Sequence, residues 1–143
     1  MKKPAENSEE FLQIIREWQA LEDKTVESAS ALINKTNNPL VKMTMEMIKH
    51  DSEKHKVMQQ MIIDNLTKEA VHLSHDELAP LSDLLNSHME AEAKSLSLAD
   101  AALQHSELFI TRYILSYLIA DEMKHHSLIG KLNELKRSAA FVT

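Results

Sequence analysis

Inward-facing positions recur at alternating intervals of four and three residues along most of this chain. The clearest stripe consists of Phe11, Ile15, Trp18, Glu22, Thr25, Ala29 and Leu32. Such heptad spacing is typical of long helices that pack against other helices. Sheet proteins need many turns, and turns with positive φ draw on glycine, yet Gly130 is the one glycine among 143 residues. The sequence therefore predicts an all-α protein.

Four stretches show this helical spacing, and we expect helices over residues 7–36, 39–66, 80–104 and 106–137 of a single domain spanning 1–143. Helices of this length predict a four-helix bundle. The second helix carries its expected inward stripe on Val41, Thr44, Ile48, Asp51, His55, Met58 and Ile62. The start of the third helix has two interpretations. Ser74 and Glu77 form a capping box, whereas Pro80 disfavours helix directly before it.

The charge and the residue types that are missing exclude several kinds of function. Sixteen basic against 22 acidic residues give a net charge of −6, so we expect no nucleic-acid partner. Without cysteine there is no disulfide framework and no thiolate metal site. No apolar run reaches the length of a signal peptide core or a membrane span, so we expect a cytoplasmic protein without a membrane partner.

Six polar residues interrupt the inward stripes at positions where leucine or isoleucine is expected: Glu22, Asp51, His55, Glu92, Asp121 and His125. Burying an isolated carboxylate costs several kcal/mol unless it is paired, hydrogen-bonded or bound to a metal. Six such residues call for a common explanation, and carboxylates with histidines are typical metal ligands.

An internal repeat relates these polar residues to one another. The offset in numbering that superimposes Glu22 on Glu92 also superimposes Asp51 on Asp121 and His55 on His125, without gaps. This pattern indicates a duplicated helical hairpin, whose copies carry equivalent residues at equivalent heights.

The spacing within each copy predicts which residues face each other. Glu22 and His55 are equally far from the Asn38–Pro39 turn, one before it and one after it, and Glu92 and His125 have the same separation. Each antiparallel hairpin should therefore place one carboxylate level with one imidazole. Glu122 shares a helix face with His125 three residues later. His88, one turn before Glu92, is a reserve candidate for the same site.

These residues make the chain similar to the ferritin-like superfamily, especially its rubrerythrin-like and bacterioferritin-like members, over about residues 10–136. In that family two hairpins each supply one Glu and one Glu-x-x-His motif, which together hold two iron or manganese ions. The resemblance implies that Glu22, His55, Glu92, Glu122 and His125 bind two metal ions, iron first, with manganese and zinc as alternatives. It places Asp51 and Asp121 next to the ligands and not among the ligands themselves. It also implies oxidoreductase chemistry on dioxygen or peroxide.

The first hairpin departs from the family pattern. Ser52 stands where the repeat and the family both lead us to expect a ligand Glu. Either Asp51 replaces it, or the site is incomplete. The alternative function is therefore a degenerate ferritin-like bundle that acts as an oligomeric or interaction protein. In both cases we expect a homo-oligomer, a dimer or larger.

The connection between the hairpins decides the topology of the bundle. Residues 67–79 reach about 43 Å when extended, which allows the long crossover of the family. If the third helix begins at His75 instead, about seven residues remain, they reach about 23 Å, and a simple up-down-up-down order follows. The resemblance favours the crossover.

Overall fold

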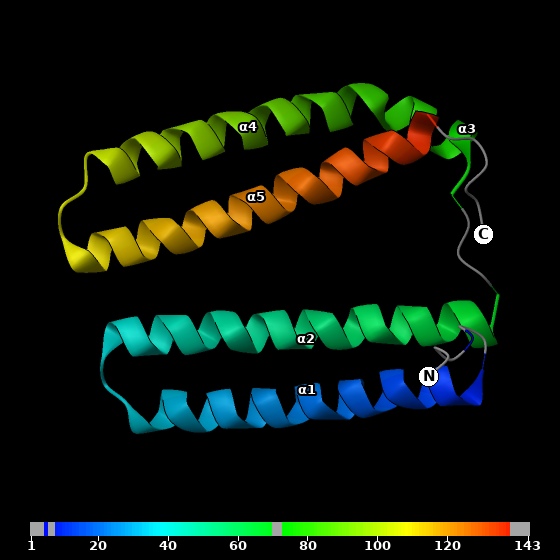
Figure 1. Cartoon of the computed structure of the whole chain (residues 1–143), viewed down its shortest axis with the longest axis horizontal. Helices are drawn as coiled ribbons and strands as arrows, with labels where there is room; N and C mark the ends of the chain where they lie inside the picture. The colour runs from blue at the N-terminus through cyan, green and yellow to red at the C-terminus, as the bar shows by residue number, and fades with distance from the viewer. Residues whose placement is uncertain (1–4, 6–7, 70–72, 138–143) are drawn as a thin grey trace. The chain divides into compact units, whose positions relative to one another are not determined.

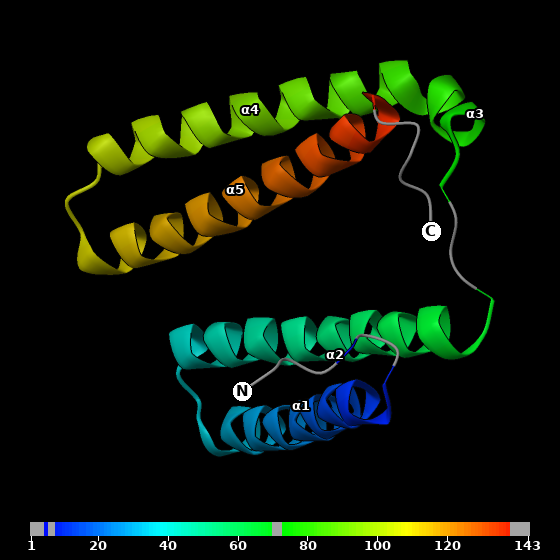
Figure 2. The same ribbon diagram turned by 45° about the vertical axis from the view of Figure 1, so that its right-hand side comes forward.

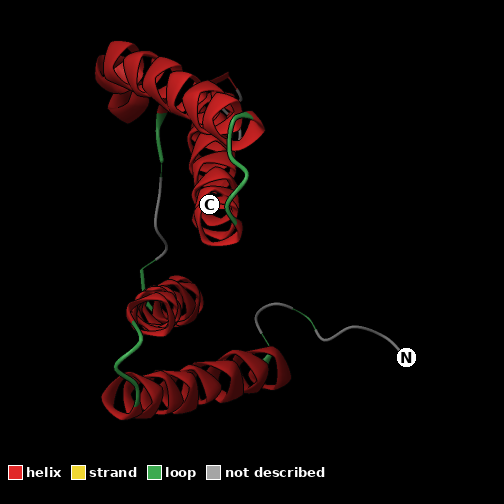
Figure 3. Cartoon of the chain, turned by 90° about the vertical axis from the view of Figure 1, so that its left-hand side faces the viewer, coloured by secondary structure: helices red, strands yellow, loops and turns green. Residues whose placement is uncertain are grey.

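A computed structural model describes residues 5, 8–69 and 73–137 of the chain (Figure 1). Every regular element in these residues is helical, and Figure 3, coloured by secondary structure, shows no strand among them. The prediction of an all-α protein is confirmed. None of the described helices combines the length and the apolar character needed to cross a membrane.

The chain divides into two compact units, residues 1–71 and 72–143, and each is built on a helical hairpin. The first hairpin consists of α1 (Glu9–Lys35) and α2 (Pro39–Thr67), which lie side by side and run in opposite directions (Figures 1 and 2). The expected single domain of four packed helices remains a prediction.

Side-chain caps fix where both helices of the first hairpin begin. The Ser8 hydroxyl accepts a hydrogen bond from the backbone N–H of Phe11 at 3.1 Å. Asn38 Oδ1 accepts from the N–H groups of Leu40 and Val41, at 2.9 and 3.2 Å. These bonds satisfy donors that the first helical turn leaves free. Together with Pro39 they explain why the predicted starts, 7 and 39, lie so close to those observed.

The interface between α1 and α2 is narrow and partly polar. Leu12, Ile15 and Ile63 form its apolar cluster, at the end of the hairpin farthest from the turn. The buried residues of α2 are Ser52, Gln59 and Ile63. None of the seven residues of the predicted α2 stripe is buried within the first hairpin, and their place in the interior of a four-helix bundle remains a prediction. Apolar periodicity selected a neighbouring face, because two of the three residues that α2 buries are polar.

Gln59 is a buried residue whose side-chain amide lacks hydrogen-bond partners within the described part of the chain. Only 3% of its surface is exposed, and neither Oε1 nor Nε2 has a hydrogen-bond partner among the described residues. Because an unsatisfied buried polar group costs about 1–3 kcal/mol, we expect Gln59→Leu to raise the free energy of unfolding by about that amount. Urea denaturation measures the change. The matched variant at an exposed glutamine, Gln13→Leu, should stay within about 0.5 kcal/mol of the wild type. A destabilised Gln59→Leu protein would contradict the prediction.

The second hairpin consists of α4 (Ser82–Gln104) and α5 (Phe109–Arg137), preceded by the short α3 (His75–Leu78) and a 3₁₀ turn, η1 (Ala79–Leu81). Helix α5 begins three residues later than predicted. Arg112 holds the intervening turn, because its Nη1 donates to the carbonyl oxygens of Leu103 and Ser106, both at 2.9 Å.

Both sequence signals around residue 75 operate in the structure. Ser74 N–H donates to Glu77 Oε2 at 2.8 Å, and Glu77 N–H donates to Ser74 Oγ at 3.2 Å, which is the predicted capping box. Pro80 lies in η1, so the α-helical geometry is interrupted where its ring disfavours it. An extended connection over 67–79 is therefore wrong in its second half, since residues 75–81 are helical. The crossover itself remains a prediction, because residues 70–72 lie outside the described residues.

Candidate metal centre

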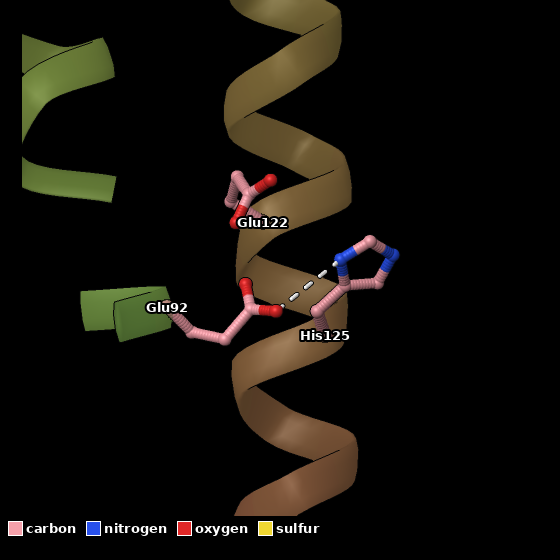
Figure 4. A group of neighbouring side chains, drawn as sticks. All are labelled: Glu92, Glu122 and His125. Atoms are coloured by element: carbon pink, nitrogen blue, oxygen red, sulfur yellow. Dashed lines mark ion pairs between the residues drawn. The ribbon is translucent and has the colours of Figure 1, made fainter. Parts of the chain in front are cut away.

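The second hairpin brings three ligand-bearing side chains together. Glu92 on α4 and Glu122 and His125 on α5 each offer one ligand atom, and these atoms lie within 4.8 Å of one another. Figure 4 shows Glu92 reaching from α4 toward Glu122 and His125, which follow each other along α5. The i,i+3 spacing on α5 and the level position of Glu92 produce this arrangement, as the sequence predicted.

Glu92 is the central member of the group. Its side chain is 12% exposed, and its Oε1 lies 3.8 Å from His125 Nδ1 and 3.0 Å from His88 Nε2. The predicted facing of Glu92 and His125 is confirmed. Oε2 of Glu92 is buried and has no hydrogen-bond partner among the described residues. A buried carboxylate oxygen without a donor is what a bound cation would satisfy.

The two carboxyl groups perturb each other's protonation. A hydrogen bond from protonated Glu122 stabilises the Glu92 carboxylate and lowers the pKa of Glu92. The same hydrogen bond raises the pKa of Glu122, and burial and the negative charge of Glu92 raise it further. The metal-free pair therefore retains a proton above the ordinary range of glutamate. A metal ion would replace that proton, because carboxylates bind metal in their ionised form.

The proton on Glu122 makes the stability of the metal-free hairpin depend on pH. Because the pKa of Glu122 is raised on folding, its stabilising contribution is complete below the ordinary glutamate pKa and is lost as pH rises through the raised value. Glu122→Gln keeps a donor toward Glu92 at every pH. We expect the metal-free variant to melt at a higher temperature than the wild type at about pH 7, and at an equal temperature near pH 4.

Thermal melts in the presence of a chelator test this expectation. Glu90→Gln, at an exposed position of α4, makes the same change in net charge and should leave the pH profile of the melting temperature unchanged. Equal melting temperatures of Glu122→Gln and wild type at neutral pH would be the contrary result.

The first hairpin contains a smaller version of this arrangement. Glu22 is buried, with 8% of its surface exposed, and its Oε2 lies 3.4 Å from His55 Nδ1. The predicted facing of these two residues is thus confirmed as well. Ser52 is also buried, at 5% exposure, and supplies no carboxylate. Within the described residues, Glu22 and His55 belong to no group of three possible metal ligands.

The two aspartates of the repeat lie outside the groups that the structure brings together. Asp121 Oδ1 forms an ion pair with Lys124 Nζ on the same helix, at 3.3 Å. Asp51 is partly buried on α2 and does not join Glu22 and His55 in a three-ligand group of the described residues. Their positions next to the metal ligands remain predictions. The replacement of the absent glutamate by Asp51 also remains a prediction.

His88, the reserve candidate, lies next to the three-residue group but is not a member of it. It contacts Glu92 more closely than His125 does, and it lines a pocket of about 350 Å³ together with Glu92, His125, Leu128 and Ile129. The signal in the sequence is its place one turn before Glu92 on the inward stripe of that helix.

The donor set of the second hairpin fits a transition metal, since it combines carboxylate oxygens with imidazole nitrogen around a buried oxygen that lacks a donor. The first hairpin fits less well, because it offers two ligands. Comparisons of the chain with protein-family models, curated proteins and solved structures found no match.

Proposed function

We propose that this chain is a ferritin-like metal-binding protein that holds iron, or alternatively manganese or zinc, through carboxylates and histidines on its helical hairpins. The observation that carries the proposal is the group of Glu92, Glu122 and His125, whose ligand atoms lie within 4.8 Å on two helices. A structural role alone would not need a second carboxyl group and an imidazole beside a carboxylate that is 12% exposed.

The correspondence between the two hairpins supports the ferritin-like interpretation. The offset that takes Glu22 to Glu92 carries the bounds of α2, Pro39–Thr67, onto those of α5, Phe109–Arg137. The same offset carries the contact between Glu22 and His55 onto that between Glu92 and His125. In a four-helix bundle of two such hairpins, these pairs together are suited to a dinuclear centre.

Each residue has a distinct task in this proposal. Glu92 and Glu122 supply the negative charge that a divalent or trivalent ion requires, and Glu122 gives up its proton when the ion binds. His55 and His125 supply neutral nitrogen ligands. Leu128 and Ile129 line the pocket beside Glu92. Bound iron would supply the electrons for an oxidoreductase reaction with dioxygen or peroxide.

Metal analysis of the full chain tests the proposal. Protein produced in iron-rich medium and purified without chelator should contain at least one equivalent of a transition metal, and a chelator should lower its melting temperature, because a ligand that binds the folded state stabilises it. Metal content at background level after growth in iron-, manganese- and zinc-supplemented media would contradict it.

The second candidate is a degenerate ferritin-like bundle that acts as an oligomeric or interaction protein. Ser52 favours it, because the first hairpin lacks the third ligand that the repeat leads us to expect. Without a metal to bind, the buried carboxylates are only costly, so this candidate expects a Glu22→Gln/Glu92→Gln variant to be as stable as the wild type or more so. The metal-binding proposal expects that variant to lose the stabilisation by metal.

A further inference from the structure

We propose that His88 positions Glu92 for metal binding, as a hydrogen-bond donor that stays outside the ligand set. This inference rests on the proposed metal binding by Glu92, Glu122 and His125. It gives a task to a side chain that contacts Glu92 but does not belong to that three-residue group.

His88 lies against one particular oxygen of the Glu92 carboxylate. The two residues are four positions apart on α4, so their side chains share a helix face. His88 Nε2 is 3.0 Å from Glu92 Oε1, which is the usual N···O distance of a hydrogen bond. With its proton on Nε2, His88 therefore donates to Oε1. Because both residues belong to one helix, this contact does not depend on α5.

The contact leaves the other oxygen of Glu92 for a metal ion. Oε2 is buried and has no hydrogen-bond partner among the described residues. A donor on Oε1 restricts rotation of the carboxylate, so Oε2 keeps a fixed direction. Carboxylates that bind metals are commonly hydrogen-bonded in this way, and a ligand that is already oriented loses less conformational freedom when the ion binds.

The two histidines near Glu92 differ in their relation to it. His125 Nδ1 is 3.8 Å from Glu92 Oε1, beyond hydrogen-bonding distance, and the dashed line in Figure 4 marks this pair. His125 is a member of the three-residue group, whereas His88 is not. His125 is thus available to a metal ion, and His88 is engaged with the carboxylate.

The first hairpin has neither the third ligand nor the positioning histidine. The offset that relates the two hairpins places Trp18 at the position of His88. The same offset places Ser52 at the position of Glu122. The first hairpin forms without a histidine at this position, so the packing of a hairpin does not require one. The histidine occurs in the copy that also has the complete group, which supports a role in that site.

The exposure of His88 sets the size of the expected effect. Its side chain is 54% exposed, whereas that of Glu92 is 12% exposed. Loss of a residue that orients a metal ligand lowers metal affinity roughly 10- to 100-fold. Because water can partly replace a donor that is half exposed, we expect a loss of about 10-fold, at the lower end of this range.

Titration of the metal-free full chain with cobalt(II), followed by the visible absorption of the bound ion, tests the inference. His88→Leu removes the donor and should weaken cobalt binding about 10-fold. At saturating cobalt its absorption spectrum should equal that of the wild type, because the ligands are unchanged. His125→Ala removes a ligand and should change the spectrum. His88→Gln keeps an N–H donor and should bind cobalt with an affinity close to that of the wild type.

The control is His50→Leu. His50 is an exposed histidine on α2 that lies 3.9 Å from the carboxylate of Glu46, four residues before it, and its loss should leave cobalt binding unchanged. Circular dichroism checks that each variant keeps its helix content. Wild-type affinity in His88→Leu, a changed spectrum of that variant at saturation, or an equal loss in His88→Gln would overturn the inference and leave metal binding intact. A wild type that binds neither cobalt nor iron would overturn both proposals.

Discussion

Glu92→Ala is expected to reduce the metal content of the purified protein to background. Glu92 contacts both His88 and His125, and its ligand atom lies within 4.8 Å of that of Glu122, so the other candidate ligands of the second hairpin are positioned around it. Its removal leaves two histidines and one carboxylate without the group that connects them. Metal analysis of wild type and variant, produced side by side in iron-rich medium, measures the loss.

The matched control for this experiment is Glu90→Ala. Glu90 is an exposed glutamate on the same helix, so the control makes the same change in charge and in helix propensity. It should retain the metal content of the wild type. Wild-type metal content in Glu92→Ala would refute the assignment of this centre.

The second large effect is expected for Ser52→Glu. This variant should be less stable than the wild type without metal, and bound metal should restore its stability. Ser52 is 5% exposed on the interface between α1 and α2, and the buried Glu22 is on the other helix of that interface. A new carboxylate at this depth without a partner should destabilise the metal-free protein by about 3–5 kcal/mol. With a metal present, the same carboxylate takes the place that Glu122 occupies in the second hairpin.

Two measurements follow these opposite effects. Thermal melts with a chelator should show the loss of stability, and added cobalt(II) should restore it while a second equivalent binds. The control is Ser28→Glu, an exposed serine-to-glutamate change on α1, which should alter neither. If Ser52→Glu binds no more metal than the wild type, the first hairpin is not a counterpart of the second.

The sequence was sufficient for the helices and for the pairs that face each other. Helix bounds follow from local signals, such as the Asn38 cap with Pro39, which the structure retains within a few residues. The facing of Glu22 with His55, and of Glu92 with His125, follows from counting residues on either side of a turn. Both inferences use information that lies within one hairpin.

The sequence did not predict which face of each helix is buried against its neighbour. Ser52 and Gln59 face α1 although apolar periodicity selects their neighbours, because hydrophobicity indicates a broad face and does not identify which helix covers it. The contact of His88 with Glu92 was also not predictable, because a histidine at this spacing occurs on many solvated helices. Its distance of 3.0 Å from Glu92 depends on side-chain conformation, which spacing alone does not fix.

The hairpin turns have a consequence for how the two copies could diverge. No described residue has a positive φ, and the single glycine lies inside α5, where a methyl group in place of its hydrogen would meet nothing within 4 Å. The backbone of the turns at 36–38 and 105–108 is therefore open to any L-amino acid, and the main side-chain requirement there is the Asn38 cap of α2. Substitutions at the other turn positions should be nearly neutral, whereas substitutions at the facing positions change the chemistry. After a duplication, such turns would lose their similarity first, and the paired Glu and His positions would preserve the record of the shared origin.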